Sequence, residues 1–235
     1  TDVTTDWATL GIWGPSARNV LQAVTRDDVS NEAFPFMTAK RLKIEGIEIL
    51  AQRVTYVGEL GWELYMPFDA ATQVWDALMA AGKDYGIQPA GYKALEALRL
   101  EKAYRYWTAD ITPADNPYEA GLGFCVQLNK GEFMGRAALE KIKREGIQRR
   151  LCTLAMDGNA IIYGGEAVSA NGKVVARLRS GGYGYTVEKN IGYAYLPLDL
   201  AKVATRLDVE AFGERIAAEV APDVLYDARG EHLRQ

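Results

Sequence analysis

The stretch RVTYVGELGWELYMP, Arg53 to Pro67, contains two alternating segments around a glycine-flanked turn. Alternation of apolar and polar residues on both sides of the turn predicts two short β-strands, each buried on one face. The second strand places Glu63 between Trp62 and Leu64, shortly after Tyr56. Acidic residues are depleted in strands and rarely buried without a partner. Glu63 is therefore a candidate acceptor for a flat ligand with adjacent N–H donors; the alternative is an ordinary acidic side chain on the solvent face of a strand.

The composition is that of an ordinary globular protein. The chain has 235 residues, of which 49% are hydrophobic and 25% charged, which is enough for one large domain or two small ones. A net charge of −4 argues against nucleic acid or an anionic membrane as the main partner. No apolar run reaches the length that a bilayer requires, and the first ten residues lack a secretory pattern. We expect a protein of the cytoplasm or of an organelle matrix.

The cysteines and the histidine argue against several kinds of site. Cys125 and Cys152 lie in mixed apolar segments without metal-ligand spacing, so both are expected to be reduced core residues. The only histidine, His232, lies near the end of the chain, where a nucleophile–histidine pair is not expected. One histidine and no clustered cysteines also argue against a transition-metal site. The glycine-rich strings at Gly121 and Ser180 lack the strand–loop–helix setting of a phosphate loop and are predicted to be turns.

The first part of the chain mixes strands and helices. Residues 7–13 alternate as a strand, Pro15 then opens a helix, and residues 42–56 are predicted to form a hairpin that turns at Glu45-Gly46. Three helices and a strand are predicted downstream. The first helix is capped by Asp69 and buries Val74, Trp75, Leu78 and Met79, and the second runs from Tyr92 to about Tyr104 with Arg99 and Glu101 off its apolar face. A strand over residues 118–126 and a helix over residues 135–144, with Leu139 and Ile142 inward, follow.

The pattern changes near Glu145-Gly146. From Arg149 onward, short strand-like segments alternate with glycine turns: LCTLAMD, GEAVSANGKVVARLRSGG, NIGYAYLP and RLDVEAFGERIAAEV. This spacing predicts a small antiparallel barrel, with Asn171-Gly172 as its clearest hairpin turn. The predicted domains are residues 1–147 and 148–235.

Several motifs in order resemble the aminomethyltransferase family of the glycine-cleavage T-protein. They are GPSARNVL from Gly14, SNEAFPF from Ser30, RVTYVGELGWELYMP, ALRLEKAYRYW from Ala97, NPYEAGLGFCV from Asn116, FMGRAAL from Phe133 and RSGGYGYTVEKNIGYAYLP from Arg179. The likeness runs from about Trp7 to the terminal LYDARGE and is strongest to the folate-binding C-terminal half of dimethylglycine and sarcosine dehydrogenases and oxidases. It implies an α+β fold around a channel for tetrahydrofolate, with a C-terminal antiparallel β-barrel.

The resemblance also implies the site. In such proteins the carboxylate seven residues after the motif tyrosine binds the pterin edge, which assigns Glu63 and Tyr56 here. Trp107 and Glu119 are further candidates for cofactor binding. The T-protein carries an arginine where this chain has Leu95, which favours the dehydrogenase-like branch. The family's catalytic aspartate belongs to a segment upstream of the first residue, so no catalytic residue is assigned within this chain.

The function that the resemblance implies is one-carbon transfer. A flavin domain or subunit, with FAD outside this chain, would oxidise an N-methyl amine, and tetrahydrofolate bound by this chain would capture the one-carbon unit. The chain is expected to be a fragment or subunit with folate and a flavin-containing partner, and without nucleic acid, metal or membrane. A glycine-cleavage-type aminomethyltransferase, a folate-dependent demethylase and a non-catalytic folate-binding or assembly module remain alternatives.

Overall fold

The computed structural model describes residues 1–158 and 160–235, which form two compact units. The first unit comprises Thr1–Leu95 and Asp227–Gln235, and the second comprises Glu96–Tyr226. Within the described residues, every helix is too short or too polar to cross a membrane.

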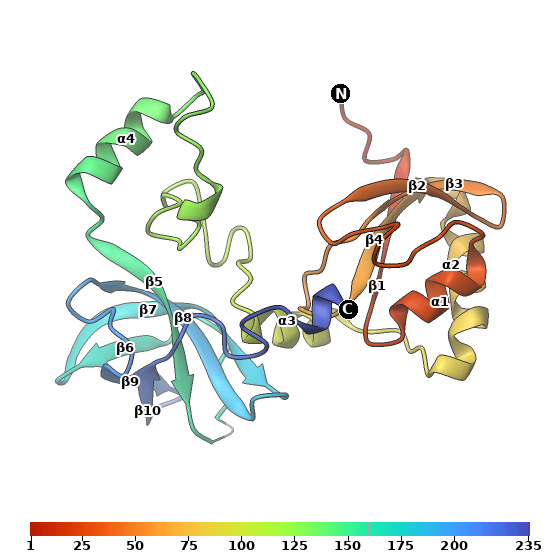
Figure 1. The fold of residues 1–235 in the computed structure, drawn as a ribbon. Coiled ribbons are helices and arrows are strands. Elements are labelled where there is room, and N and C mark those ends of the chain that lie inside the picture. The colour runs from red at the N-terminus through yellow and green to blue at the C-terminus, as the bar shows by residue number, and fades with distance from the viewer. Residues whose placement is uncertain (159) are drawn as a thin grey trace. The chain divides into compact units, whose positions relative to one another are not determined.

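The first unit is an antiparallel four-stranded sheet with helices on one face (Figure 1). The strand order is β1-β4-β3-β2, so β4 is flanked on both sides. The hairpin between β2 and β3 turns at Glu45 and Gly46, both with positive φ, as the sequence predicts. The elements are β1 (Trp7–Trp13), α1 (Ala17–Val24), β2 (Ala39–Ile44), β3 (Ile47–Gln52), β4 (Gly61–Pro67), α2 (Ala71–Gly82) and the start of α3 (Tyr92–Glu101), with 3-10 turns at Phe68–Ala70, Lys83–Tyr85 and His232–Arg234.

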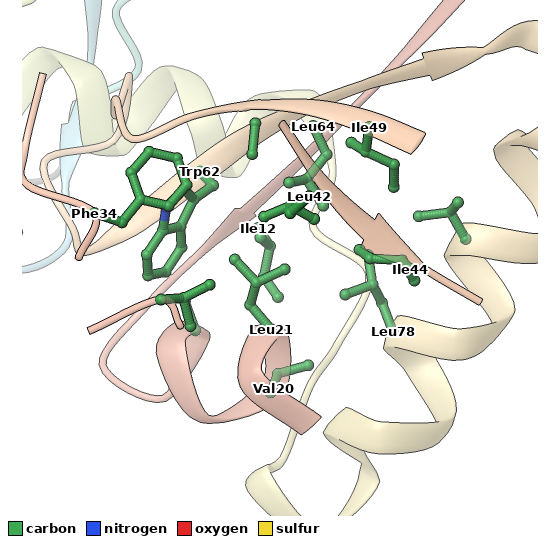
Figure 2. Close-up of a cluster of buried hydrophobic side chains, with 14 of the residues drawn as sticks. Ile12, Val20, Leu21, Phe34, Leu42, Ile44, Ile49, Trp62, Leu64 and Leu78 are labelled. Atoms are coloured by element: carbon green, nitrogen blue, oxygen red, sulfur yellow. The ribbon is translucent and has the colours of Figure 1, made fainter. Parts of the chain in front are cut away.

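The core of this unit lies between the sheet and helices α1 and α2 (Figure 2). Strand β4 supplies Trp62, Leu64 and Met66, all fully buried, because alternate residues of a strand point to the same face. The helices supply Val20 and Leu21 from α1 and Val74 and Leu78 from α2. Burial of these side chains stabilises the unit by about 1.5–3 kcal/mol each.

Three predictions for this unit are wrong. Residues 53–56 form no strand, because the buried Arg53 side chain donates to the carbonyls of Phe34 and Gln235, and the chain then leaves the sheet in a turn. Trp75 is 41% exposed rather than buried. The helices start later than predicted: α1 begins two residues later, after Ser16, and α2 begins one residue later, after a 3-10 turn that contains Asp69.

The second unit contains a closed six-stranded antiparallel barrel (Figure 1). Its strand order is β10-β5-β8-β7-β6-β9, and the pairing of β10 with both β5 and β9 leaves no free sheet edge. Asn171 and Gly172, with positive φ, form the predicted two-residue turn between β6 and β7. The strands are β5 (Arg149–Met156), β6 (Ala167–Ala170), β7 (Lys173–Gly184), β8 (Lys189–Pro197), β9 (Arg206–Ala211) and β10 (Glu214–Val220), preceded by a 3-10 turn at Gly123–Cys125 and helix α4 (Arg136–Glu145).

The segment between α3 and the barrel differs most from the predictions. Helix α3 ends at Glu101 rather than near Tyr104, because Ala103 has positive φ and the amides of Lys102 and Tyr104 bond back to the Arg99 carbonyl. Arg99 and Glu101, predicted to lie off the apolar face of the helix, are both buried.

Further corrections concern residues 118–145. Residues 118–126 form turns and a 3-10 helix, not a strand. Helix α4 forms as predicted but contains no fully buried residue, so Leu139 and Ile142 are only half-buried. Cys125 is exposed, whereas Cys152 is buried as expected.

Candidate functional site

Glu63 lies on the face of the sheet opposite the hydrophobic core. Its strand neighbours Trp62 and Leu64 are fully buried, whereas Glu63 is half-buried. The register of the sheet places Gly11 of β1 on one side of Glu63 and Gln52 of β3 on the other. The carboxylate therefore sits near the middle of this outer face, between two strands that leave it partly accessible.

A neighbouring hydroxyl orients the Glu63 carboxylate. The Tyr65 hydroxyl donates a hydrogen bond of 2.5 Å to Oε2 of Glu63, since residues i and i+2 of a strand share one face. This hydrogen bond, with burial as a smaller cause, raises the pKa of Tyr65 to about 12. An ionised carboxylate has about four acceptor positions, so Glu63 retains acceptor capacity beyond the bond to Tyr65.

The indole of Trp13 provides a flat surface beside Glu63. A Cβ placed on Gly11 would lie 2.2 Å from the six-membered ring of Trp13, so the ring covers the backbone of the residue that pairs with Glu63. The indole Nε1 donates to the carbonyl of Val54 at 3.0 Å, which holds the ring in this position. Trp13 is absent from the predicted site residues, although two glycines, Gly11 and Gly61, leave room for its ring.

Tyr56 lies in the turn that leads into β4. The Thr55 hydroxyl accepts hydrogen bonds from the amides of Val57 and Gly58, at 3.2 and 3.0 Å, and Gly58 has a φ of 79°. A threonine that bonds to amides two and three residues ahead favours a turn over a strand. Tyr56 is half-buried at the second position of this turn. Tyr56 and Glu63 thus both belong to the first unit, in a turn and in the strand that follows it.

Trp107 and Glu119 belong to the second unit. The Trp107 side chain is 57% exposed, and its backbone bridges to Ile111. Oε2 of Glu119 accepts a hydrogen bond of 3.1 Å from Nε of Arg149, and the backbone carbonyl of Glu119 accepts from Leu151. The contacts of Glu119 are therefore made with the first strand of the barrel.

A buried ion pair holds the end of α3. Arg99 and Asp110 are both fully buried, with Arg99 Nη1 2.5 Å from Asp110 Oδ2. The same guanidinium donates to Glu96 and to the Ser180 hydroxyl at 2.7 Å. Buried charges are found where partners satisfy them, so this network is part of the scaffold of the second unit.

The elements of both units together define the fold of an aminomethyltransferase. Aminomethyltransferase T of the glycine cleavage system from Bartonella henselae superimposes with a TM-score of 0.83 at 25% identity, over 94% of this chain and 60% of that one. The match includes the closed antiparallel barrel that the sequence predicts.

The chain belongs to the glycine cleavage T-protein family. The GCVT N-terminal domain matches residues 1–130, and the glycine cleavage T-protein C-terminal barrel domain matches residues 149–227. Human mitochondrial dimethylglycine dehydrogenase is 40% identical over 226 residues, which is 95% of this chain and 26% of that protein. Mouse mitochondrial sarcosine dehydrogenase is 44% identical over 196 residues, 83% of this chain and 21% of that protein. The chain thus spans about a quarter of the length of these relatives.

Proposed function

We propose that this chain is the tetrahydrofolate-binding portion of a dimethylglycine or sarcosine dehydrogenase-like enzyme. Such an enzyme transfers a one-carbon unit from an N-methyl amine to tetrahydrofolate. Support comes from the family and from the identity to the two dehydrogenases, 40% and 44%. The observation that carries the assignment is the half-buried Glu63 carboxylate, oriented by Tyr65 on the open face of the sheet.

The residues around Glu63 fit a pterin. The edge of a pterin carries adjacent N–H donors, and a carboxylate can accept two of them in parallel. A charge-assisted contact of this kind contributes about 1.5–3 kcal/mol, a substantial share of a micromolar affinity. The Trp13 indole, held over Gly11, offers a flat apolar surface next to the carboxylate. Bound tetrahydrofolate would supply the nitrogen atoms that accept the one-carbon unit, and the role of this chain is to hold and orient it.

The remaining candidates take different roles in this proposal. Tyr56, in the turn before β4, is proposed to contact the ligand. Trp107 has an exposed indole that could stack on an aromatic ring. Glu119 is proposed as a further cofactor-binding residue, and its backbone carbonyl is held by the Leu151 amide of strand β5. No residue of this chain is assigned as catalytic.

Further parts of the proposal concern organisation. We propose two domains, residues 1–147 and 148–235, and the separate family matches to residues 1–130 and 149–227 support this division. A flavin-containing domain or subunit with FAD is the proposed partner, by analogy with the dehydrogenase relatives. We place the protein in the cytoplasm or in the mitochondrial matrix; the dehydrogenase relatives are named as mitochondrial.

A second candidate is a glycine-cleavage-type aminomethyltransferase. It is favoured by the fold match to aminomethyltransferase T, which covers 94% of this chain. The two candidates share the folate site and differ in the donor of the one-carbon unit. A folate-dependent demethylase would also share this site and use another donor. A non-catalytic folate-binding module would keep the site and lack turnover.

The test is calorimetric titration of tetrahydrofolate into the full chain and into Glu63→Gln. Loss of the charged acceptor is expected to weaken binding about tenfold or more, which corresponds to about 1.4 kcal/mol. Glu48→Gln is the matched control, because Glu48 is an exposed carboxylate on the same sheet, paired with Arg41. Absence of saturable binding by the folded wild-type chain, or equal binding by wild type and Glu63→Gln, would contradict the assignment.

A further inference from the structure

A hollow of about 550 Å³ lies on the outer side of the barrel, over strands β5, β8 and β7. Every charged side chain that lines it is an arginine: Arg149, Arg177 and Arg179. Gln148 and Tyr195 add further hydrogen-bond donors, and the rest of the lining is small or apolar. Within the part of the chain that the structure describes, the lining contains no carboxylate.

Two of these arginines are held in place around Tyr195. The guanidinium carbons of Arg149 and Arg179 lie 4.5 and 5.1 Å from the centre of the Tyr195 ring. Behind them, the fully buried Asp115 accepts from Nη2 of both arginines, at 2.8 and 3.3 Å. Glu119 adds a second contact to Arg149. Each guanidinium has five N–H groups, so these contacts orient the two side chains and leave donors for a ligand.

Arg177 adds a positive charge that lacks an acidic partner among the described residues. Its side chain is exposed on β7, two residues before Arg179 and on the same face of the strand, and it donates to the Gly165 carbonyl. Asp115 and Glu119 balance Arg149 and Arg179, so the hollow as a whole carries a net positive charge.

The Tyr195 hydroxyl is the second observation that points to a ligand. Tyr195 is only 7% exposed, and among the described residues its hydroxyl has no hydrogen-bond partner. A buried hydroxyl without a partner is unfavourable, and such groups in native proteins call for an explanation. The hydroxyl has almost no accessible surface, so a ligand oxygen in the hollow would provide the missing acceptor only after the side chains around Tyr195 shift.

We propose that this hollow binds a small molecule that carries carboxylate or phosphate groups. Guanidinium groups match the geometry of both oxyanions, and the volume is that of a small-molecule site. The Glu63 site offers an acceptor to N–H donors, whereas this hollow offers donors to oxygen acceptors. The two sites therefore favour ligands with opposite hydrogen-bonding groups, and this proposal does not rest on the proposed folate site.

The test is calorimetric titration of the full chain with two probes, pyrophosphate and citrate, at constant ionic strength. Saturable binding of at least one probe is expected, and the stronger probe distinguishes a phosphate ligand from a carboxylate ligand. Arg177→Gln removes an exposed charge without breaking an ion pair and is expected to weaken binding about five- to tenfold. Tyr195→Phe removes only the unpartnered hydroxyl and is expected to weaken binding while the chain remains folded, as monitored by circular dichroism.

Arg215→Gln is the matched control, since Arg215 is an exposed arginine on strand β10 of the same barrel. Its substitution changes the net charge by the same amount as Arg177→Gln and is expected to leave the affinity unchanged. The proposal is overturned if neither probe binds, or if Arg215→Gln weakens binding as much as Arg177→Gln does.

Discussion

The Tyr65 hydroxyl and the Glu63 carboxylate are joined by a hydrogen bond of 2.5 Å on the open face of strand β4. The bond depends on the two-residue period of the strand, which also sends Trp62, Leu64 and Met66 to the core. One carboxylate oxygen is thereby fixed in position, so a ligand that binds Glu63 meets an oriented acceptor rather than a mobile one.

Glu63→Gln is expected to lower the pKa of Tyr65 from about 12 toward its ordinary value of 10.0, because the hydrogen bond to the Glu63 carboxylate is the main cause of the shift. Ultraviolet absorbance of the phenolate, followed during titration with base, measures this change. Tyr65→Phe in the same titration identifies the signal that belongs to Tyr65. An unchanged titration curve in Glu63→Gln would show that the bond does not form in solution.

The same shift predicts a loss of stability at high pH. The pKa of Tyr65 is higher in the folded protein than in the unfolded chain, so its contribution is fully present below about pH 10 and is lost as the pH rises toward 12. Tyr195 is expected to add to this loss of stability at high pH, since burial raises its pKa to about 12. Urea unfolding at a series of pH values is expected to show a free energy of unfolding that falls above about pH 10, and less steeply in Tyr65→Phe.

Trp13→Phe is expected to cost about 1 kcal/mol of stability, because the hydrogen bond from the indole to the Val54 carbonyl is lost. If Trp13 supports the ligand at Glu63, the same variant also weakens tetrahydrofolate binding. Trp75→Phe serves as the control, since Trp75 is an exposed tryptophan on α2 of the same unit. Urea unfolding and calorimetry of both variants make the comparison, and equal behaviour of the two would argue against a role for Trp13.

Asp110→Asn is expected to destabilise the second unit by about 3–5 kcal/mol, because it leaves the fully buried Arg99 without its charged partner. Glu48→Gln removes the partner of Arg41 in an exposed pair and is expected to change stability by less than about 1 kcal/mol. Denaturant unfolding measures both. A small effect of Asp110→Asn would mean that the contacts of Arg99 to Glu96 and Ser180 are enough to stabilise its buried charge.

Cys125 and Cys152 are expected to differ in reactivity. Cys125 is exposed, whereas Cys152 is buried and burial raises the pKa of its thiol to about 11. A coloured thiol reagent at neutral pH should modify one thiol of the folded chain rapidly and the second only after unfolding. Cys125→Ser is expected to abolish the rapid phase, and rapid modification of both thiols would contradict the burial of Cys152.

Elements that depend on local pattern could be predicted from the sequence. The alternation in residues 61–67 and the turns at Glu45-Gly46 and Asn171-Gly172 are properties of short segments, and all three appear in the structure. The strand predicted over residues 118–126 does not form, because an apolar segment becomes a strand only if a partner strand pairs with it. The strand predicted to contain Val54 and Tyr56 does not form, because the Thr55 hydroxyl stabilises a turn there instead.

The sequence predicts the antiparallel barrel and the position of Glu63 on a strand through local pattern, because period and turn chemistry act over a few residues, and it implies the α+β fold class through its family resemblance. It also contained the ordered motifs by which the family is identified. Only the tertiary structure decided that Trp13 covers Gly11 beside Glu63, that Asp110 folds back onto Arg99, and that Asp115 bridges two arginines of the barrel. The contacts of Asp110 and Asp115 join residues 11 to 64 positions apart, and their energy depends on burial and geometry that no local pattern encodes.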